Sequence, residues 1–227
     1  GAGNKHGIGR HLAFSTVKVK LGSHTTCLAV LDHLMPSLLY SRCPLALLRE
    51  PLGLVAEQKV AQRQGAAWLG AALLSRLLGR AVSPGEISRS AQGAPLHPEA
   101  HLSLSHSGDW VAAAVAFSPV GIDIEVPKTG RDIPALAAYL GWQVEDFYRN
   151  WCSFEAAVKT GVGELGPRQL QWREKALVLP CQNLLYCFTR QQPFFMSLAS
   201  VTKTRPRWQS PMLMLAEYLL ECRAHTG

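Results

Sequence analysis

The sequence predicts an α+β fold made of two similar halves, each a helix packed on a small antiparallel sheet. Each half holds a long segment with apolar residues at helical spacing, followed by about three short strand-like runs. The turns between these runs are short, which favours antiparallel neighbours. We therefore expect residues 1–117 to form an N-terminal half and residues 118–227 a C-terminal half, in a pseudo-twofold arrangement.

The first half combines a strand-like segment, a long helix and a series of short strands. Residues 25–34 have strand character, and apolar residues recur along a helix over residues 54–78 until a glycine ends it. Short runs follow at residues 101–106, 110–117 and 120–126, separated by the turn sequences Ser-Gly-Asp and Ser-Pro. We expect these three runs to form an antiparallel meander.

The second half returns to helix and then to strands. Helical spacing predicts helices over residues 133–140 and 144–159. Strand-like runs follow at residues 175–180, 184–189 and 194–200, and the chain closes with an apolar tail. This order matches that of the first half, although the two halves share no obvious sequence repeat.

Composition and charge narrow the class of protein. Hydrophobic residues make up 48% of the 227 positions and charged residues 17%, which excludes a disordered chain. No apolar run approaches the ~20 residues of a membrane helix. Six cysteines show neither CxxC pairs nor zinc-like spacing with the eight histidines, so we expect reduced thiols and a cytoplasmic location. The net charge of +7 indicates an anionic partner: a nucleic acid, a phosphorylated cofactor or an acidic protein.

Two carboxylates interrupt the apolar segment Val-Gly-Ile-Asp-Ile-Glu-Val at residues 120–126. The alternation predicts a half-buried strand from which Asp123 and Glu125 project on the same face, close enough to share one divalent cation. Oxygen ligands favour Mg²⁺, or Mn²⁺, over zinc. Taken alone, this pattern is more often an ordinary charged strand face.

A third acid and several possible phosphate donors strengthen this interpretation. Trp151, Glu155 and Lys159 are spaced four residues apart and form one stripe along a helix face, which by itself would be an ordinary surface pattern. Ser105 and His106 lie where a strand meets its turn, and both can donate to a phosphate. In the expected meander, His106 would lie two strands away from the strand acids. The sequence thus predicts an acid cluster with phosphate donors beside it.

Three motifs in this order resemble those of the 4′-phosphopantetheinyl transferases. They are Leu-Ser-Leu-Ser-His-Ser-Gly, Gly-Ile-Asp-Ile-Glu and Trp-Cys-Ser-Phe-Glu-Ala-Ala-Val-Lys, within residues 102–159. The closest resemblance is to the broad-specificity, surfactin-synthetase-activating type, which is a pseudo-dimer in one chain. It implies Mg²⁺-dependent transfer of the 4′-phosphopantetheine group from coenzyme A to a serine of an apo acyl or peptidyl carrier protein, with release of 3′,5′-ADP. Such enzymes serve fatty acid, polyketide and nonribosomal peptide biosynthesis.

The resemblance also implies roles for the matching positions. The metal-binding acids of the family match Asp123, Glu125 and Glu155, and its coenzyme A-binding residues match Ser105, His106 and Lys159. We expect Asp123, Glu155 and Lys159 to act in catalysis, with Glu155 or a metal-bound water taking the proton of the attacking serine.

The chain departs from the family pattern at three positions. Ala94 stands where a Gly-Lys-Pro motif usually has its lysine, and Phe154 stands where a lysine usually precedes the helix glutamate. The family usually has an arginine on its first helix. The nearest candidates in this chain are Arg63 and Lys59, and we assign Arg63 to coenzyme A binding. Each missing charge-assisted contact could cost about 1.5–3 kcal/mol of binding, roughly tenfold or more in affinity.

Two other functions stay open at this point. Dispersed Lys and Arg with six Trp could form a basic nucleic-acid-binding module, and the changes at Ala94 and Phe154 could mark a catalytically impaired module that only binds carrier proteins. However, the basic residues do not cluster with the aromatic ones, and the strand acids would repel a nucleic acid backbone. We therefore expect coenzyme A and an acidic carrier protein as partners, without a membrane or nucleic acid, and a monomer.

Overall fold

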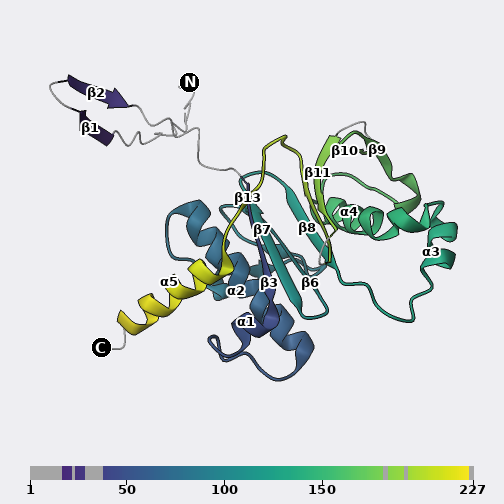
Figure 1. Cartoon of the computed structure of the whole chain (residues 1–227), viewed down its shortest axis with the longest axis horizontal. Helices are drawn as coiled ribbons and strands as arrows, with labels where there is room; N and C mark the ends of the chain where they lie inside the picture. The colour runs from purple at the N-terminus through teal and green to yellow at the C-terminus, as the bar shows by residue number, and fades with distance from the viewer. Residues whose placement is uncertain (1–16, 22–23, 29–37, 181–183, 192–193, 225–227) are drawn as a thin grey trace, which may run out of the picture. The chain divides into compact units, whose positions relative to one another are not determined.

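Figure 1 shows the computed structural model. It describes residues 17–21, 24–28, 38–180, 184–191 and 194–224. The chain divides into two compact units, Gly1–Met35 and Pro36–Gly227. In the first unit, β1 (Val17–Leu21) and β2 (His24–Leu28) pair as an antiparallel hairpin. The strand expected over residues 25–34 is therefore found as far as Leu28, and its remainder lies outside the described residues.

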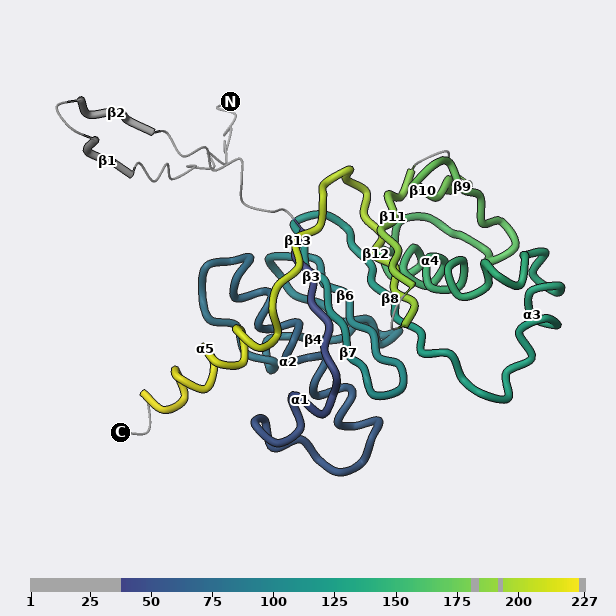
Figure 2. Tube along the Cα trace, in the orientation of Figure 1, coloured from purple at the N-terminus to yellow at the C-terminus, as the bar shows by residue number. Residues whose placement is uncertain are grey.

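The first sheet of the unit Pro36–Gly227 has the strand order β13-β3-β7-β6. Its strands are β3 (Leu38–Pro44), β6 (His101–Ser107), β7 (Trp110–Ala116) and β13 (Arg207–Trp208). The pairs β3–β7 and β6–β7 are antiparallel, whereas β13 runs parallel to β3. Figure 2 shows the C-terminal part of the chain returning from the second sheet to the first, where β13 lies beside β3.

The second sheet of the same unit has the order β8-β12-β11-β10-β9 and is antiparallel throughout. Its strands are β8 (Val120–Glu125), β9 (Gln171–Arg173), β10 (Ala176–Val178), β11 (Leu184–Arg190) and β12 (Phe195–Ser200). Because β8 is at one end of the order, its second edge has no backbone partner in the sheet.

Two helices, α2 (Gln58–Leu78) and α4 (Phe147–Lys159), support the sheets. The Glu57 side chain caps α2 by accepting from two backbone N–H groups of its first turn, and Gly79 ends the helix in the left-handed conformation at φ 67°. The other helices are α1 (Leu45–Arg49), α3 (Ile133–Leu140) and α5 (Pro211–Ala224). Strands β4 (Ser88–Arg89) and β5 (Pro95–Leu96) form a separate small hairpin.

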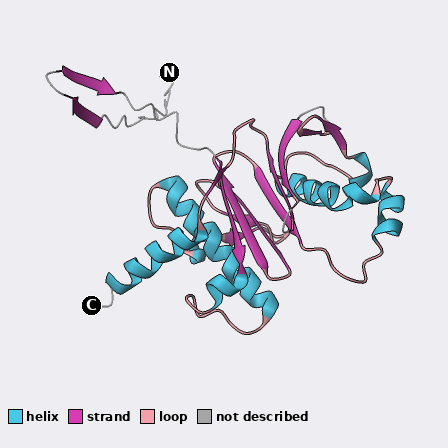
Figure 3. Cartoon of the chain, in the orientation of Figure 1, coloured by secondary structure: helices cyan, strands magenta, loops and turns pink. Residues whose placement is uncertain are grey.

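The elements of this unit stack in four layers, α2, first sheet, second sheet and α4 (Figure 3). Alternation along β7 serves two of the interfaces, because Val111, Ala113 and Val115 pack toward α2 while Ala112 and Ala114 pack toward the second sheet. A third apolar cluster lies between the second sheet and α4. The strands β7, β8 and β12 are therefore buried on both faces.

The α+β fold class is confirmed, but the expected meander is wrong at its third strand. β6 and β7 pair as expected, whereas β8 pairs with β12 in the other sheet. The reason is that β7 already has two neighbours, β6 on one edge and β3 on the other. Strand β3 was not expected from the sequence, and it takes the edge that the meander assigned to β8.

Other features of the described residues extend the comparison with the sequence. The apolar tail contains the helix α5, which the sequence analysis did not assign. The pseudo-twofold arrangement and the boundary between residues 117 and 118 stay predictions; that boundary lies in the turn where the chain passes from β7 to β8. Cys43, Cys152 and Cys187 are buried free thiols. In the part of the chain that the structure describes, no helix is both long and apolar enough to cross a membrane.

Gly121 determines how closely α4 approaches β8. A Cβ atom at this position would overlap the backbone carbonyl oxygen of Ala156, which cannot turn aside. We expect Gly121→Ala to lower the free energy of unfolding by about 1–3 kcal/mol or more, measured by denaturant titration. Gly85→Ala is the control, because its Cβ would approach only Ser83 Oγ, at 3.6 Å. Equal unfolding midpoints for the two variants would contradict this account of the contact.

Candidate functional site

Strands β6 and β8 belong to different sheets, yet serine side chains join them. Hydroxyls at alternate positions of β6 accept hydrogen bonds from the backbone N–H groups of alternate residues of β8 and of the residue that follows it. The pairs are Ser103 with Ile122 (3.0 Å), Ser105 with Ile124 (3.2 Å) and Ser107 with Val126 (3.0 Å). Since residue numbers rise together along both strands, β6 and β8 run parallel. We call these three contacts the serine ladder.

Two hydroxyls of the serine ladder also bind the strand acids. Ser105 Oγ donates to Asp123 Oδ1 at 2.9 Å, and Ser107 Oγ donates to Glu125 Oε2 at 3.3 Å. A hydroxyl can donate one proton while it accepts another, so each of these serines makes both contacts at once. The third serine, Ser103, contacts the backbone of β8. The prediction that β6 lies two strands away from the acids is therefore wrong, because β6 is the direct neighbour of β8.

Asp123 is buried beneath α4, with 6% of its surface exposed. The expectation of a half-buried strand is thus wrong for β8, because α4 covers the face that carries the acids and only Glu125 is partly open. Lys159 compensates the buried charge: its Nζ lies 2.6 Å from Asp123 Oδ1 and 3.2 Å from the Ile122 carbonyl oxygen. Asp123 Oδ2 is buried and has no hydrogen-bond partner among the described residues.

Glu155 lies half-buried on α4, in the electric field of both strand acids. Burial raises the pKa of the Glu155 carboxyl, and the negative charges of Asp123 and Glu125 raise it further, while Lys159 acts in the opposite sense. The three predicted acids therefore influence one another. As they stand, no three His, Cys, Asp or Glu side chains in the described part of the chain are grouped closely enough to hold a metal ion.

A buried thiol, Cys152, completes the surroundings of the acids. Burial, followed by the charges of Asp123 and Glu125, raises the pKa of the Cys152 thiol, which keeps it protonated and neutral. Sequence reasoning did not select this residue. Its position three residues before Glu155 on α4 was the available signal, because residues three apart share a helix face.

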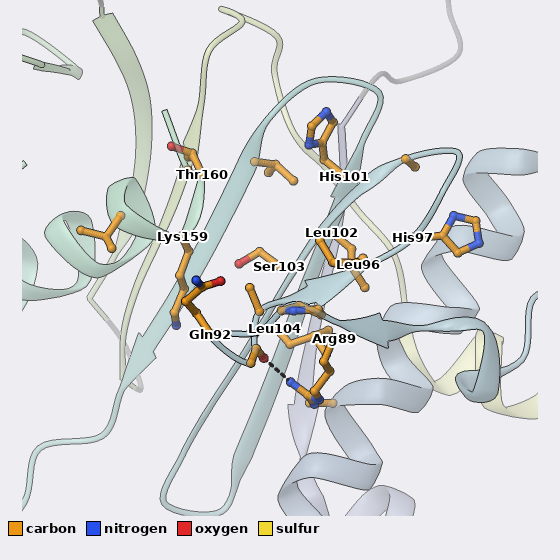
Figure 4. A pocket seen from close by; sticks show the side chains of 18 of the residues that line it. Arg89, Gln92, Leu96, His97, His101, Leu102, Ser103, Leu104, Lys159 and Thr160 are labelled. Atoms are coloured by element: carbon orange, nitrogen blue, oxygen red, sulfur yellow. Dashed lines mark hydrogen bonds between the residues drawn. The ribbon is translucent and has the colours of Figure 1, made fainter. Parts of the chain in front are cut away.

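A cavity of about 1110 Å³ opens beside the serine ladder. Leu104 and His106 of β6 line it, together with Arg63 of α2 and the β4–β5 hairpin on one side and Lys159 and Thr160 on the other. Figure 4 shows Lys159 and Thr160 on one side of Ser103 and Leu102 of β6, with Gln92 of the hairpin turn close to Lys159 in this view. The cavity therefore crosses the line along which the two sheets meet.

The cavity lining is rich in basic side chains. They are Arg63, Arg89, His97, His101, His106 and Lys159. Among the described residues that line the cavity, the one carboxylate is that of Glu99, which forms an ion pair with Arg80. Arg89 donates from Nη1 to the Gly93 carbonyl oxygen at 2.8 Å and so braces the hairpin turn (Figure 4). Such a lining favours a ligand with several negative charges.

His106 lies at the boundary between the cavity and the acids. Desolvation lowers the pKa of its imidazole, and the neighbouring charges of Lys159 and Arg63 lower it further, while Asp123 opposes them. In the free protein the neutral ring, which has one N–H donor, is therefore favoured. An anion bound in the cavity would stabilise the protonated ring.

The predicted coenzyme A-binding residues occupy different places. Arg63, His106 and Lys159 line the cavity, whereas Lys59 does not. The Ser105 hydroxyl is directed to Asp123 instead of the lining. At the two departures from the family pattern, Ala94 lines the cavity without a charge, and the Phe154 ring packs on Trp151 with 5.8 Å between centroids.

Sequence reasoning missed three basic residues of the lining, Arg89, His97 and His101. The signal for Arg89 was its position just before the Gly-Ala-Pro segment, since β4 and β5 pair Arg89 with Pro95. His97 follows this short strand, and His101 begins β6. Nothing in their spacing predicts that all three contribute to one cavity.

Comparison with known proteins identifies relatives but no matching family model. A Haemophilus influenzae protein provisionally named 4′-phosphopantetheinyl transferase is 31% identical over 135 residues, which are 49% of this chain and 57% of the relative. The 4′-phosphopantetheinyl transferase of Bacillus subtilis is 35% identical over 77 residues, 29% of this chain and 34% of the relative. The 4′-phosphopantetheinyl transferase psf-1 of Bacillus pumilus is 68% identical over 31 residues, 14% of this chain and 13% of the relative.

The region shared with these relatives is partial. The chain spans little more than half the length of the Haemophilus influenzae relative and about a third of the Bacillus subtilis one. All three relatives nevertheless carry the same name, 4′-phosphopantetheinyl transferase. These similarities support the resemblance of this chain to the 4′-phosphopantetheinyl transferase superfamily.

Proposed function

We propose that this protein transfers the 4′-phosphopantetheine group of coenzyme A to a serine of an apo acyl or peptidyl carrier protein. One observation carries the proposal: the acids Asp123, Glu125 and Glu155 lie beside a cavity with a cationic lining. Transfer of a phosphoryl-type group needs both parts, since the pyrophosphate must be bound and its developing charge neutralised. The named relatives support the same reaction.

The three acids have the ligand chemistry of a Mg²⁺ site, although as they stand they are not grouped closely enough to hold the ion. All three candidate ligands are carboxylates, which hard cations prefer. Asp123 Oδ2 is buried without a partner among the described residues, and a buried carboxylate oxygen gains most from a cation. We assign Asp123, Glu125 and Glu155 as the residues that would hold Mg²⁺. When bound there, the ion would neutralise charge on the pyrophosphate.

Coenzyme A fits the cavity by charge. It carries a pyrophosphate and a further phosphate, and the lining offers two guanidinium groups, an ammonium group and three imidazoles. We propose that Arg63, His106 and Lys159 contact its phosphates. Arg89 lies beside Ala94 in the hairpin and supplies a cation close to the position where the family usually has a lysine.

In the proposed reaction, the serine hydroxyl of the carrier attacks the β-phosphorus of coenzyme A. A new bond forms between the serine oxygen and that phosphorus, and the bond to the oxygen bridging the α-phosphate breaks. The electron pair of this bond leaves with 3′,5′-ADP. Glu155 takes the serine proton as a general base. Lys159 stabilises the charge on the leaving group.

The remaining expectations accompany this proposal. A net charge of +7 favours encounter with an acidic carrier protein. We propose a cytoplasmic monomer and a pseudo-twofold arrangement of residues 1–117 and 118–227. The packing of α2 on the first sheet and of α4 on the second supports this arrangement, although β13 and α5 of the second half also join the first helix–sheet layer.

The transfer itself can be tested by mass spectrometry. Incubation of the protein with coenzyme A, Mg²⁺ and an apo carrier protein should raise the carrier mass by one phosphopantetheine group. A carrier whose acceptor serine is replaced by alanine is the matched control and should gain nothing. Failure with several apo carriers, under conditions in which a known transferase modifies them, would reject the proposed function.

The acids should be required for transfer but not for folding. Asp123→Asn and Glu155→Gln keep the shape of each side chain but remove a metal-binding charge, so we expect loss of at least about 100-fold in kcat/KM. Circular dichroism should show an unchanged fold. Glu164→Gln, an exposed acid outside the site, is the control and should retain activity. Near-normal turnover by either site variant would refute the metal assignment.

The cavity cations should act mainly on coenzyme A binding. Arg89→Ala removes one charge-assisted contact, so we expect affinity for coenzyme A to fall roughly tenfold or more, measured by calorimetry. Arg173→Ala removes a cation from the second sheet, outside the cavity, and serves as the control. If both variants bound coenzyme A as tightly as the unmodified protein, Arg89 would not be a ligand contact.

A further inference from the structure

We infer that Ser107, together with Ser105, is a positioning residue for the metal-binding acids. Their hydroxyls belong to the first sheet, and the carboxylates that they orient belong to the second. The two serines thus join the sheets and also orient the carboxylates of Asp123 and Glu125. This inference rests on the proposed function only for the use of the metal.

The geometry leaves each acid with one oxygen for a cation. Ser107 Oγ donates to Glu125 Oε2, and Ser105 Oγ donates to Asp123 Oδ1. In each case the backbone N–H of the next residue donates to the same hydroxyl, which fixes the direction of its proton. A carboxylate held through one oxygen presents its other oxygen in a defined direction.

Glu125 should depend on its serine more than Asp123 does. Asp123 is buried and has a second fixed partner, because Lys159 Nζ lies 2.6 Å from the same Oδ1 atom. Glu125 is only partly buried and has the longer side chain, so it has more rotamer freedom to lose. Loss of the Ser107 hydroxyl should therefore disturb the orientation of an acid more than loss of the Ser105 hydroxyl would.

Ser107 itself is held firmly. It is 7% exposed, and the turn that follows it is tied to α2 by a 2.6 Å hydrogen bond from Gln62 Nε2 to the Gly108 carbonyl oxygen. On the other side, Gly108 lies against Val126, because a Cβ at position 108 would be 3.3 Å from that side chain. The Ser107 hydroxyl thus has a fixed place between α2 and β8 from which to orient Glu125.

The serine ladder contains its own control. Ser103 accepts from the Ile122 N–H at 3.0 Å, as Ser107 does from that of Val126, but among the described residues it binds no carboxylate. Ser103 also lines the cavity, so coenzyme A has to be saturating for each variant. Replacing either serine by alanine removes one backbone contact of the same kind. Only Ser107→Ala also releases an acid. A merely structural ladder would give the two variants the same metal binding.

The test measures Mn²⁺ binding in the presence of saturating coenzyme A, with free Mn²⁺ followed by electron paramagnetic resonance. We expect Ser107→Ala to raise the dissociation constant of Mn²⁺ about 10- to 100-fold, as loss of a partner to a metal ligand does. Ser107→Thr retains the hydroxyl and should restore affinity. Ser103→Ala should bind Mn²⁺ like the unmodified protein, although thermal unfolding should show both alanine variants similarly destabilised.

Each outcome decides the inference. Equal Mn²⁺ affinity of Ser107→Ala and Ser103→Ala would overturn it and leave the serine ladder as a purely structural contact. Failure of Ser107→Thr to restore affinity would also overturn it, and so would a lack of Mn²⁺ binding by the unmodified protein. If the serine variants behave as expected but no apo carrier is modified, the proposed function fails while the positioning role stands.

Discussion

The open edge of β8 is the constraint on which the rest of the site depends. An edge strand exposes N–H groups that must find partners, and in most sheets they face water or another strand. Here Ser103, Ser105 and Ser107 supply side-chain acceptors instead. A serine side chain spans a larger distance between two strands than a direct backbone hydrogen bond does. For this reason β6 and β8 can belong to two stacked sheets and still be joined. The joint also leaves room for a cavity that crosses it.

Burial of the strand acids follows from the way α4 packs on this edge strand. Gly121 lets the helix backbone come close to β8, which brings Glu155 near Asp123, buries Asp123 and half-buries Glu155. A buried carboxylate is costly unless it is paired, and Lys159 from the same helix provides the pair. The helix therefore brings both the third acid and the cation that compensates the first.

Much of this arrangement could be predicted from the sequence, because the spacing of residues shows which side chains share one face of a strand or helix. The alternation in β8 correctly grouped Asp123 with Glu125, and the four-residue spacing on α4 grouped Glu155 with Lys159. Periodicity does not report which strands are neighbours, so the meander placed β8 in the wrong sheet. Arg89 of the β4–β5 hairpin was missed for the same reason, since no pattern in the sequence connects it with a distant cavity wall.

The ion pair between Lys159 and Asp123 has a consequence for the order of events in this protein. A divalent ion bound at Asp123 Oδ2 would lie close to the ammonium group that Lys159 already places at Oδ1, and the two positive charges would repel each other. A phosphate in the cavity would give Lys159 another partner, because the same side chain lines that cavity. Metal and nucleotide would then bind cooperatively, each favouring the other by linkage. Without a metal ion, the Lys159 ammonium group already balances the charge of Asp123, so the protein would remain folded in a chelating buffer.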